Sequence, residues 1–133
     1  MTSPIRPIVA IAAIAAIEGL ACVGYGVYEA AQAVRFGATG PESVSNVPAI
    51  VLQVALFLVF GAGLLLIARG WWRLAAWARA PFVLAQLIVG LIGYELAQSA
   101  SAGIHWAGIA MALVAVLGLV LVFTPAVSRA LQA

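Results

Sequence analysis

The stretch PAIVLQVALFLVFGAGLLLIARGWWRLAAWARAP, which runs from Pro48 to Pro81, joins a long apolar run to a turn rich in arginine and tryptophan. The run from Pro48 to Ala68 carries no charged residue and is long enough, as a helix, to cross the ~30 Å hydrocarbon core of a bilayer. Because lipid offers backbone amides no hydrogen-bond partners, such a segment is expected to be helical. Arg69 and Gly70 end this run, and another begins at Pro81.

The rest of the chain shares this apolar character. Of its 133 residues, 66% are hydrophobic and 8% are charged, and the mean hydropathy is +1.20. A soluble domain carries roughly a quarter charged residues, so the composition predicts an integral membrane protein. The net charge of +2 does not suggest a nucleic-acid partner. The single cysteine, Cys22, excludes an intramolecular disulfide, and with one histidine it excludes a zinc framework of Cys and His.

Four transmembrane helices are expected in a single domain over residues 1–133, which makes the fold an all-α bundle. Glycine, proline and arginine separate the apolar runs, and the expected spans are 8–33, 48–68, 81–99 and 104–123. Pro7 suits the first turn of the first span. This span is too long for the apolar core of a signal peptide, so we interpret it as a retained helix.

Five of the six arginines lie on one side of the predicted bundle. They are Arg6, Arg69, Arg73, Arg79 and Arg129, and only Arg35 lies on the other side. Because cytoplasmic loops carry the excess of basic residues, both termini and the central loop are predicted to be cytoplasmic, in a bacterial inner (plasma) membrane. The central loop is also expected to contact lipid headgroups through Arg69, Trp71, Trp72, Arg73, Trp77 and Arg79.

One pentapeptide occurs almost unchanged in both halves of the chain, as YEAAQ at 28–32 and YELAQ at 94–98. Residues 23–32 and 89–98 share six identities in ten positions, and a weaker match relates residues 55–61 to 112–118. These matches predict two tandem hairpins of the same orientation, with halves at about 1–66 and 67–133, related by a pseudo-twofold axis along the membrane normal. Coincidence in a sequence rich in Ala, Gly and Val is the alternative interpretation.

A polar stripe follows one face of the first span. Glu18 lies about ten residues into this span, ~15 Å along the helix and near the bilayer centre. An ionisable residue there costs at least ~2.5 kcal/mol, so Glu18 is expected to face the bundle. Cys22, Tyr25, Glu29 and Gln32 continue the stripe outward at helical spacing. Gln53 and Gln86 are further polar groups within the spans that could pair with Glu18.

Polar side chains from both halves are therefore expected to line a cleft open to the outer side. The candidates for binding a ligand or a proton are Glu18, Tyr25, Glu29, Tyr94, Glu95, Gln98 and His105. If the pseudo-axis passes between the first and third spans, Glu29 and Glu95 would face each other and share a proton or attract a cation. Alternatively, these groups hydrogen-bond between helices and only fix their packing.

Two resemblances support the membrane assignment. The segments RGWWRLAAWARAP (69–81) and LVFTPAVSRAL (121–131) resemble those of small, uncharacterised four-helix membrane proteins from actinobacteria, which implies the location and the number of helices. Four short helices with an embedded glutamate in the first are also similar in architecture to the small multidrug resistance transporters. That similarity implies that Glu18 would be the proton and drug site.

The sequence contains no arrangement of residues typical of an enzyme. Serine–histidine–acid order, phosphate loops and dinucleotide fingerprints are absent from it, and no catalytic residue, metal site or cofactor is predicted. We expect a non-enzymatic accessory or binding protein that takes a lipid-type ligand or a partner helix in the outer cleft. Membrane lipids, further copies of the chain or another membrane protein are the expected partners. The alternative is a small proton- or cation-coupled transporter that uses the embedded glutamate.

Overall fold

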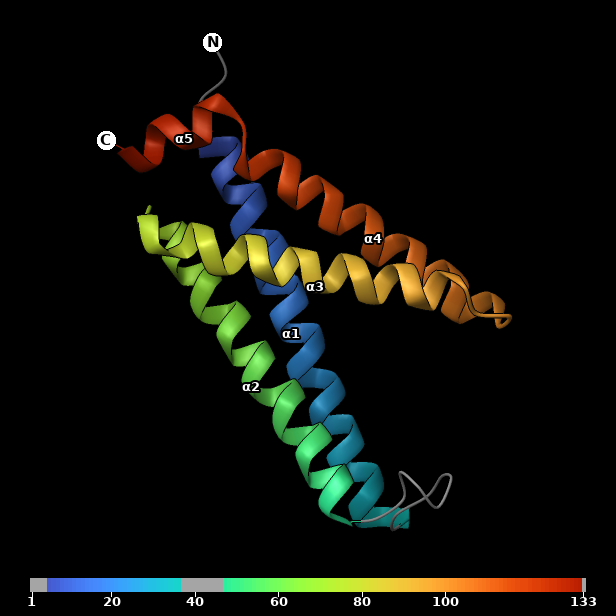
Figure 1. Cartoon of the computed structure of the whole chain (residues 1–133). Coiled ribbons are helices and arrows are strands. Elements are labelled where there is room, and N and C mark those ends of the chain that lie inside the picture. Colours follow the sequence, from blue (N-terminus) through green and yellow to red (C-terminus); the bar gives the residue numbers. More distant parts are fainter. Residues whose placement is uncertain (1–4, 37–46, 133) are drawn as a thin grey trace. The chain divides into compact units, whose positions relative to one another are not determined.

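The computed structural model describes residues 5–36 and 47–132, and all regular structure in these ranges is helical. The described residues form four long helices, a short turn of 3-10 helix and a short C-terminal helix. Figure 1 labels the helices α1 to α5. Their bounds are α1 Ile5–Phe36, α2 Val47–Trp72, η1 Ala76–Ala78, α3 Arg79–Ala97, α4 Ala102–Val122 and α5 Pro125–Gln132. Each of the four long helices is long and apolar enough to cross a membrane. The all-α fold with four candidate membrane spans is therefore confirmed.

The helices begin slightly earlier than the sequence predicts, because proline lies within the first turn of a helix and not at its first residue. Pro7, Pro48 and Pro81 were natural starting points, but each lies inside the first turn of its helix. The first backbone N–H groups of a helix have no partner within it, so proline is tolerated throughout that turn. The helix α5 was not predicted, because Thr124-Pro125 indicates the end of a span and not the start of another helix. The loop between the first two spans lies outside the described residues.

The chain divides into two compact units, which are described separately. The smaller unit comprises Ala16–Leu66 and contains the C-terminal part of α1 and most of α2. Glycines allow the two helices to approach closely: a Cβ atom added to Gly19 would lie 2.8 Å from the Gly61 carbonyl oxygen. Gly26 contacts Leu58 in the same way further along α1. Small residues at such crossings permit the van der Waals contact that holds helices together in lipid.

The larger unit comprises Met1–Ala15 and Ile67–Ala133, with α3, α4 and α5. Here α3 and α4 cross at a second glycine pair, since a Cβ atom on Gly93 would lie 2.8 Å from the Gly108 carbonyl oxygen. The largest fully buried side chains of this unit are Trp71, Phe82, Ile11, Gln86, Val122 and Val127. The rings of Trp71 and Phe82 meet edge to face with centroids 5.9 Å apart, which joins the end of α2 to the start of α3.

The turn after α2 closes with a Schellman-type pair of hydrogen bonds. The Ala75 N–H donates to the Gly70 carbonyl at 2.8 Å, and the Leu74 N–H donates to the Trp71 carbonyl at 3.0 Å. This pattern requires a left-handed residue after the helix, and Leu74 supplies it with φ of 56°. Glycine is the usual residue there because it has no Cβ to clash in that conformation.

The tandem repeat stays a prediction. The two hairpins have unequal helices, of 32 and 26 residues in the first and 19 and 21 in the second. The repeated pentapeptide lies well inside α1, whereas in the second copy α3 ends at Ala97, before the last residue of the pentapeptide. The close glycine contacts match the repeat only in part, since Gly93 corresponds to Val27, whereas Gly61 corresponds to Gly118.

Candidate functional site

The C-terminal part of α1 carries polar side chains that hydrogen-bond with one another along the helix. The Glu29 carboxylate is the side-chain hydrogen-bond partner of the Tyr25 hydroxyl, four residues earlier. One turn further, the Gln32 side-chain amide donates to the Tyr28 hydroxyl at 2.7 Å. Polar groups spaced by four residues lie on one side of a helix, so each pair satisfies its members locally.

Aromatic rings accompany these polar pairs. Tyr25 packs edge to face on Phe57 of α2 with centroids 4.8 Å apart, and its centroid lies 6.4 Å from that of Tyr28. Both tyrosines remain at the surface, with 45% and 56% of their area exposed, and Glu29 is half-buried. We call Tyr25, Tyr28, Glu29 and Gln32 the tyrosine face of α1. It is a mixed aromatic and acidic surface on a helix that otherwise exposes mainly apolar side chains.

Glu18 and Cys22 lie on the same line of α1, closer to the middle of the helix. Glu18 is half-buried, and its Oε1 atom is shielded from the surface. Cys22 is half-buried as well. At 1.5 Å per residue, Glu18 lies about 20 Å along α1 from its first residue, Ile5. Gln53 is exposed on α2, whereas Gln86 is fully buried in α3.

The second copy of the pentapeptide is arranged differently from the first. Tyr94, Glu95 and Gln98 are all exposed at the end of α3. Gln98 follows the last residue of the helix, and its side-chain amide donates to the Tyr94 carbonyl at 3.5 Å. In the first copy the equivalent glutamine bonds to the tyrosine hydroxyl. The same residues therefore close a helix end in one copy and form a surface within a helix in the other.

His105 joins the first turn of α4 to the end of α3. Its Nδ1 atom lies 2.6 Å from the Ala97 carbonyl oxygen, and its ring packs edge to face on Trp106 with centroids 5.2 Å apart. Because a carbonyl oxygen only accepts, Nδ1 must carry the proton in this bond. The sequence makes His105 a candidate for binding a ligand or a proton, but its Nδ1 atom already bonds to the Ala97 carbonyl and holds the two helices together.

The candidate residues are divided between the two units of the chain. Glu18, Tyr25 and Glu29 belong to the smaller unit, whereas Tyr94, Glu95, Gln98 and His105 belong to the larger one. Their convergence in one cleft, with Glu29 facing Glu95, stays a prediction. Among the described residues, no group of three or more His, Cys, Asp or Glu side chains is placed to hold a metal ion.

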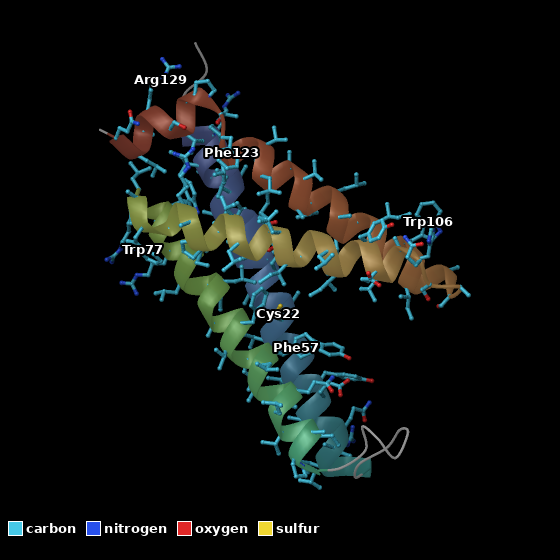
Figure 2. The ribbon with its side chains drawn as sticks, in the orientation of Figure 1. Cys22, Phe57, Trp77, Trp106, Phe123 and Arg129 are labelled. Carbon is cyan, nitrogen blue, oxygen red and sulfur yellow. The ribbon has the colours of Figure 1, made fainter. Side chains whose placement is uncertain are left out.

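The residues predicted to contact lipid headgroups, at the arginine-rich end of the larger unit, differ in their exposure. Trp72 and Trp77 are exposed, as an interfacial role requires, and so are Arg69 and Arg73. Trp71 is instead fully buried, so its ring packs inside the unit and does not reach a headgroup. Figure 2 shows Trp77, Phe123 and Arg129 at this end of the unit and Trp106 at the opposite end.

Arg79 is the residue at this end whose role the sequence did not reveal. One guanidinium nitrogen, Nη2, donates to the Val122 carbonyl at 3.4 Å and to Ser128 Oγ at 3.2 Å. The guanidinium also lies 5.4 Å from the ring centroid of Phe123. Arg79 therefore links the start of α3 to the end of α4 and to α5. The local sequence around Arg79 gives no signal of these contacts, because its partners lie more than forty residues away.

The fold and its composition define the class as a small multi-pass α-helical membrane protein. Comparison of the chain with protein-family models, curated proteins and solved structures yields no match. The particular function must therefore be argued from the residues themselves.

Proposed function

We propose that the protein is a non-enzymatic membrane protein that binds a lipid-type ligand or a partner helix on the tyrosine face of α1. The observation that supports this proposal is the exposure of Tyr25 and Tyr28 beside the half-buried Glu29, in a helix long enough to cross a bilayer. Hydrocarbon chains cannot hydrogen-bond to hydroxyl, amide and carboxylate groups, so these groups favour a neighbour that carries polar atoms of its own.

The length of α1 supports the same interpretation. Its 32 residues extend about 48 Å, whereas the hydrocarbon core is ~30 Å thick. A span that begins near Ile8 therefore brings Tyr25 to the outer leaflet and Gln32 to the level of the headgroups. A ligand with a polar head and an apolar body, or a helix with a polar outer end, matches this gradient along the helix.

Site-specific photocrosslinking in native membranes tests the proposal. A benzoyl-phenylalanine at position 25 keeps an aromatic ring on the tyrosine face and is expected to capture a defined adduct, either a lipid or a membrane protein. The matched control is position 27, which is also exposed but points to the opposite side of α1. Equal labelling from positions 25 and 27 would indicate random contact with bulk lipid and would refute a dedicated binding face.

The alternative function is transport coupled to protons or cations through Glu18. It is favoured by the position of this carboxylate in the middle of a span, half-buried and continuous with Glu29 along the helix. In proteoliposomes with an imposed pH gradient, uptake of a cationic dye would then be lost in Glu18→Gln. Dye uptake that persists in Glu18→Gln removes the coupling role, and a wild-type protein without any uptake removes the transport proposal.

We also propose that both termini and the turn between α2 and α3 are cytoplasmic. The support is the distribution of arginine, with five of the six residues on that side of the four spans. In this orientation the tyrosine face of α1 belongs to the outer half of the bilayer.

A further inference from the structure

Arg79 is a partly buried cation whose hydrogen-bond partners are neutral. Its Nη2 atom bonds to the Val122 carbonyl and to Ser128 Oγ, while no carboxylate within the described ranges pairs with its guanidinium. Within the same ranges, the N–H groups on Nη1 and Nε of Arg79 have no hydrogen-bond partner either. Guanidinium carries five donors in a rigid fork, so most of its capacity is left for a ligand.

Among the described residues, no carboxylate lies close enough to Arg79 to offset its charge. Arg69, Arg73 and Arg129 share this end of the larger unit. The only described carboxylate of the unit is Glu95, sixteen residues along α3 and about 24 Å away by helix rise. A partly buried charge without a counter-ion is costly, so an anion from outside the chain would stabilise this end.

Helix α5 holds a further donor next to Arg79. Ser128 accepts a hydrogen bond from Arg79, which leaves its own hydroxyl proton to donate. Arg129 is exposed, and its Nε donates to the Pro125 carbonyl at 3.3 Å, so it adds positive charge to the surface of the same helix. We propose that Arg79 and Ser128 bind the phosphate of an anionic phospholipid.

A phospholipid fits this position better than a soluble phosphate. The donors lie where the apolar helices α2, α3 and α4 start or end, which is the depth of lipid phosphates. Exposed Trp72, Leu74 and Trp77 border the same end and provide amphipathic and apolar surface for the glycerol and upper acyl chains. Arginine forks and hydroxyls are the donors that phosphate prefers, and their charge favours an anionic headgroup over a zwitterionic one. This inference is independent of the tyrosine face of α1.

Native mass spectrometry of the full-length protein, released from detergent with added phosphatidylglycerol, tests the site. One phosphatidylglycerol is expected to bind with an affinity at least about tenfold higher than that of phosphatidylcholine, as charge-assisted hydrogen bonds imply. Arg79→Gln and Ser128→Ala are each expected to weaken this adduct by about tenfold or more. Arg35→Gln removes the same charge from the smaller unit and is expected to leave the affinity within about twofold.

Ser128→Ala keeps the bond from Arg79 to the Val122 carbonyl, so it tests the phosphate site even where Arg79→Gln does not fold. Three results would overturn the proposal. The first is that phosphatidylcholine binds with the same affinity as phosphatidylglycerol. The second is that Ser128→Ala leaves the affinity for phosphatidylglycerol unchanged. The third is that Arg35→Gln weakens this binding as much as Ser128→Ala does. A further measurement adds millimolar inorganic phosphate to the phosphatidylglycerol complex. If phosphate displaced the lipid and bound in its place with similar affinity, the site would belong to a free anion and the lipid proposal would be refuted.

Discussion

A leucine occupies the position after α2 where most helices of this type have glycine. Leu74 has φ of 56°, in the region where a Cβ atom costs about 1–2 kcal/mol. We expect Leu74→Gly to raise the free energy of unfolding by up to about 1 kcal/mol, partly offset by the entropy that glycine loses on folding. The measurement is thermal or denaturant unfolding of the protein in a mild detergent.

Position 75 provides the matched control for this prediction. Ala75 is extended, with φ of −77° and ψ of 118°, so glycine gains nothing there. Ala75→Gly is therefore expected to leave the stability unchanged or to lower it slightly. If both variants lowered the stability equally, the left-handed conformation of Leu74 would not be a source of strain. Sequence alone could not place this residue, because leucine gives no signal of a left-handed conformation.

The glycines of α2 offer a second test at the scale of single residues. A Cβ atom on Gly61 would lie 2.8 Å from the Gly19 carbonyl oxygen and 2.7 Å from a methyl group of Val23. Backbone cannot yield as a flexible side chain can, so Gly61→Ala is expected to destabilise the smaller unit by about 1–3 kcal/mol. A Cβ atom on Gly63 meets nothing within 4 Å, so Gly63→Ala is expected to be neutral or slightly stabilising.

The two glycine variants change the helix propensity of α2 equally, and only their surroundings differ. Their melting temperatures in the same detergent therefore isolate the effect of the helix crossing. A Gly61→Ala protein as stable as Gly63→Ala would mean that α1 and α2 do not cross at Gly19. The sequence does not distinguish Gly61 from Gly63, because the position of the partner helix depends on long-range packing that a local pattern does not contain.

At the scale of whole elements, His105 fixes the start of α4 to the end of α3. The Nδ1 atom of His105 bonds to the Ala97 carbonyl, and the side-chain amide of asparagine can donate from a similar position. Asparagine at position 105 is therefore expected to preserve the stability of the hairpin better than an apolar residue. We expect His105→Leu to lower the free energy of unfolding by about 1 kcal/mol and His105→Asn to lower it less.

Hydrogen–deuterium exchange locates the effect of the His105 variants. In His105→Leu, faster exchange is expected at residues 98–104, which connect the two helices, with no change in the smaller unit. Exchange that stays unchanged there, together with wild-type stability, would show that the histidine does not hold the hairpin closed. A ligand role at the outer surface would then regain support.

How well the elements could be predicted depends on the kind of signal that defines each one. Hydropathy predicted all four spans, because length and apolar composition are local properties of the sequence. It missed α5, whose eight residues are too few and too polar to resemble a span. That helix follows Pro125, which suits a first turn, and is linked to α3 by the Arg79–Ser128 bond. This bond joins residues 49 positions apart, and such contacts are not visible in a local pattern.

At the scale of the whole molecule, the sequence repeat did not determine how each copy is used. YEAAQ lies within α1 and ends about one turn before the end of that helix, whereas YELAQ extends across the end of α3. A carboxylate within a long helix and one at a helix end meet different surroundings, even where their neighbours in sequence are identical. Convergence of Glu29 with Glu95 would require the two units to adopt one arrangement, which is a property of tertiary packing and not of the repeated motif.

The orientation of the whole molecule in the membrane yields the last prediction. With five arginines on one side of the spans, we expect residues near both termini to be cytoplasmic and residues 45 and 101 to be outside. Single cysteines introduced as Ser3→Cys, Ser45→Cys or Ser101→Cys in a Cys22→Ala background make this testable with little change in side-chain size. A membrane-impermeant maleimide applied to intact cells should label positions 45 and 101 and reach position 3 only after lysis.

Labelling of position 3 in intact cells would show that the orientation is the reverse of the predicted one. The tyrosine face of α1 would then lie in the inner leaflet and the phosphate site at the outer surface. Partial labelling at all three positions would mean that chains insert both ways, which the strong asymmetry of arginine argues against.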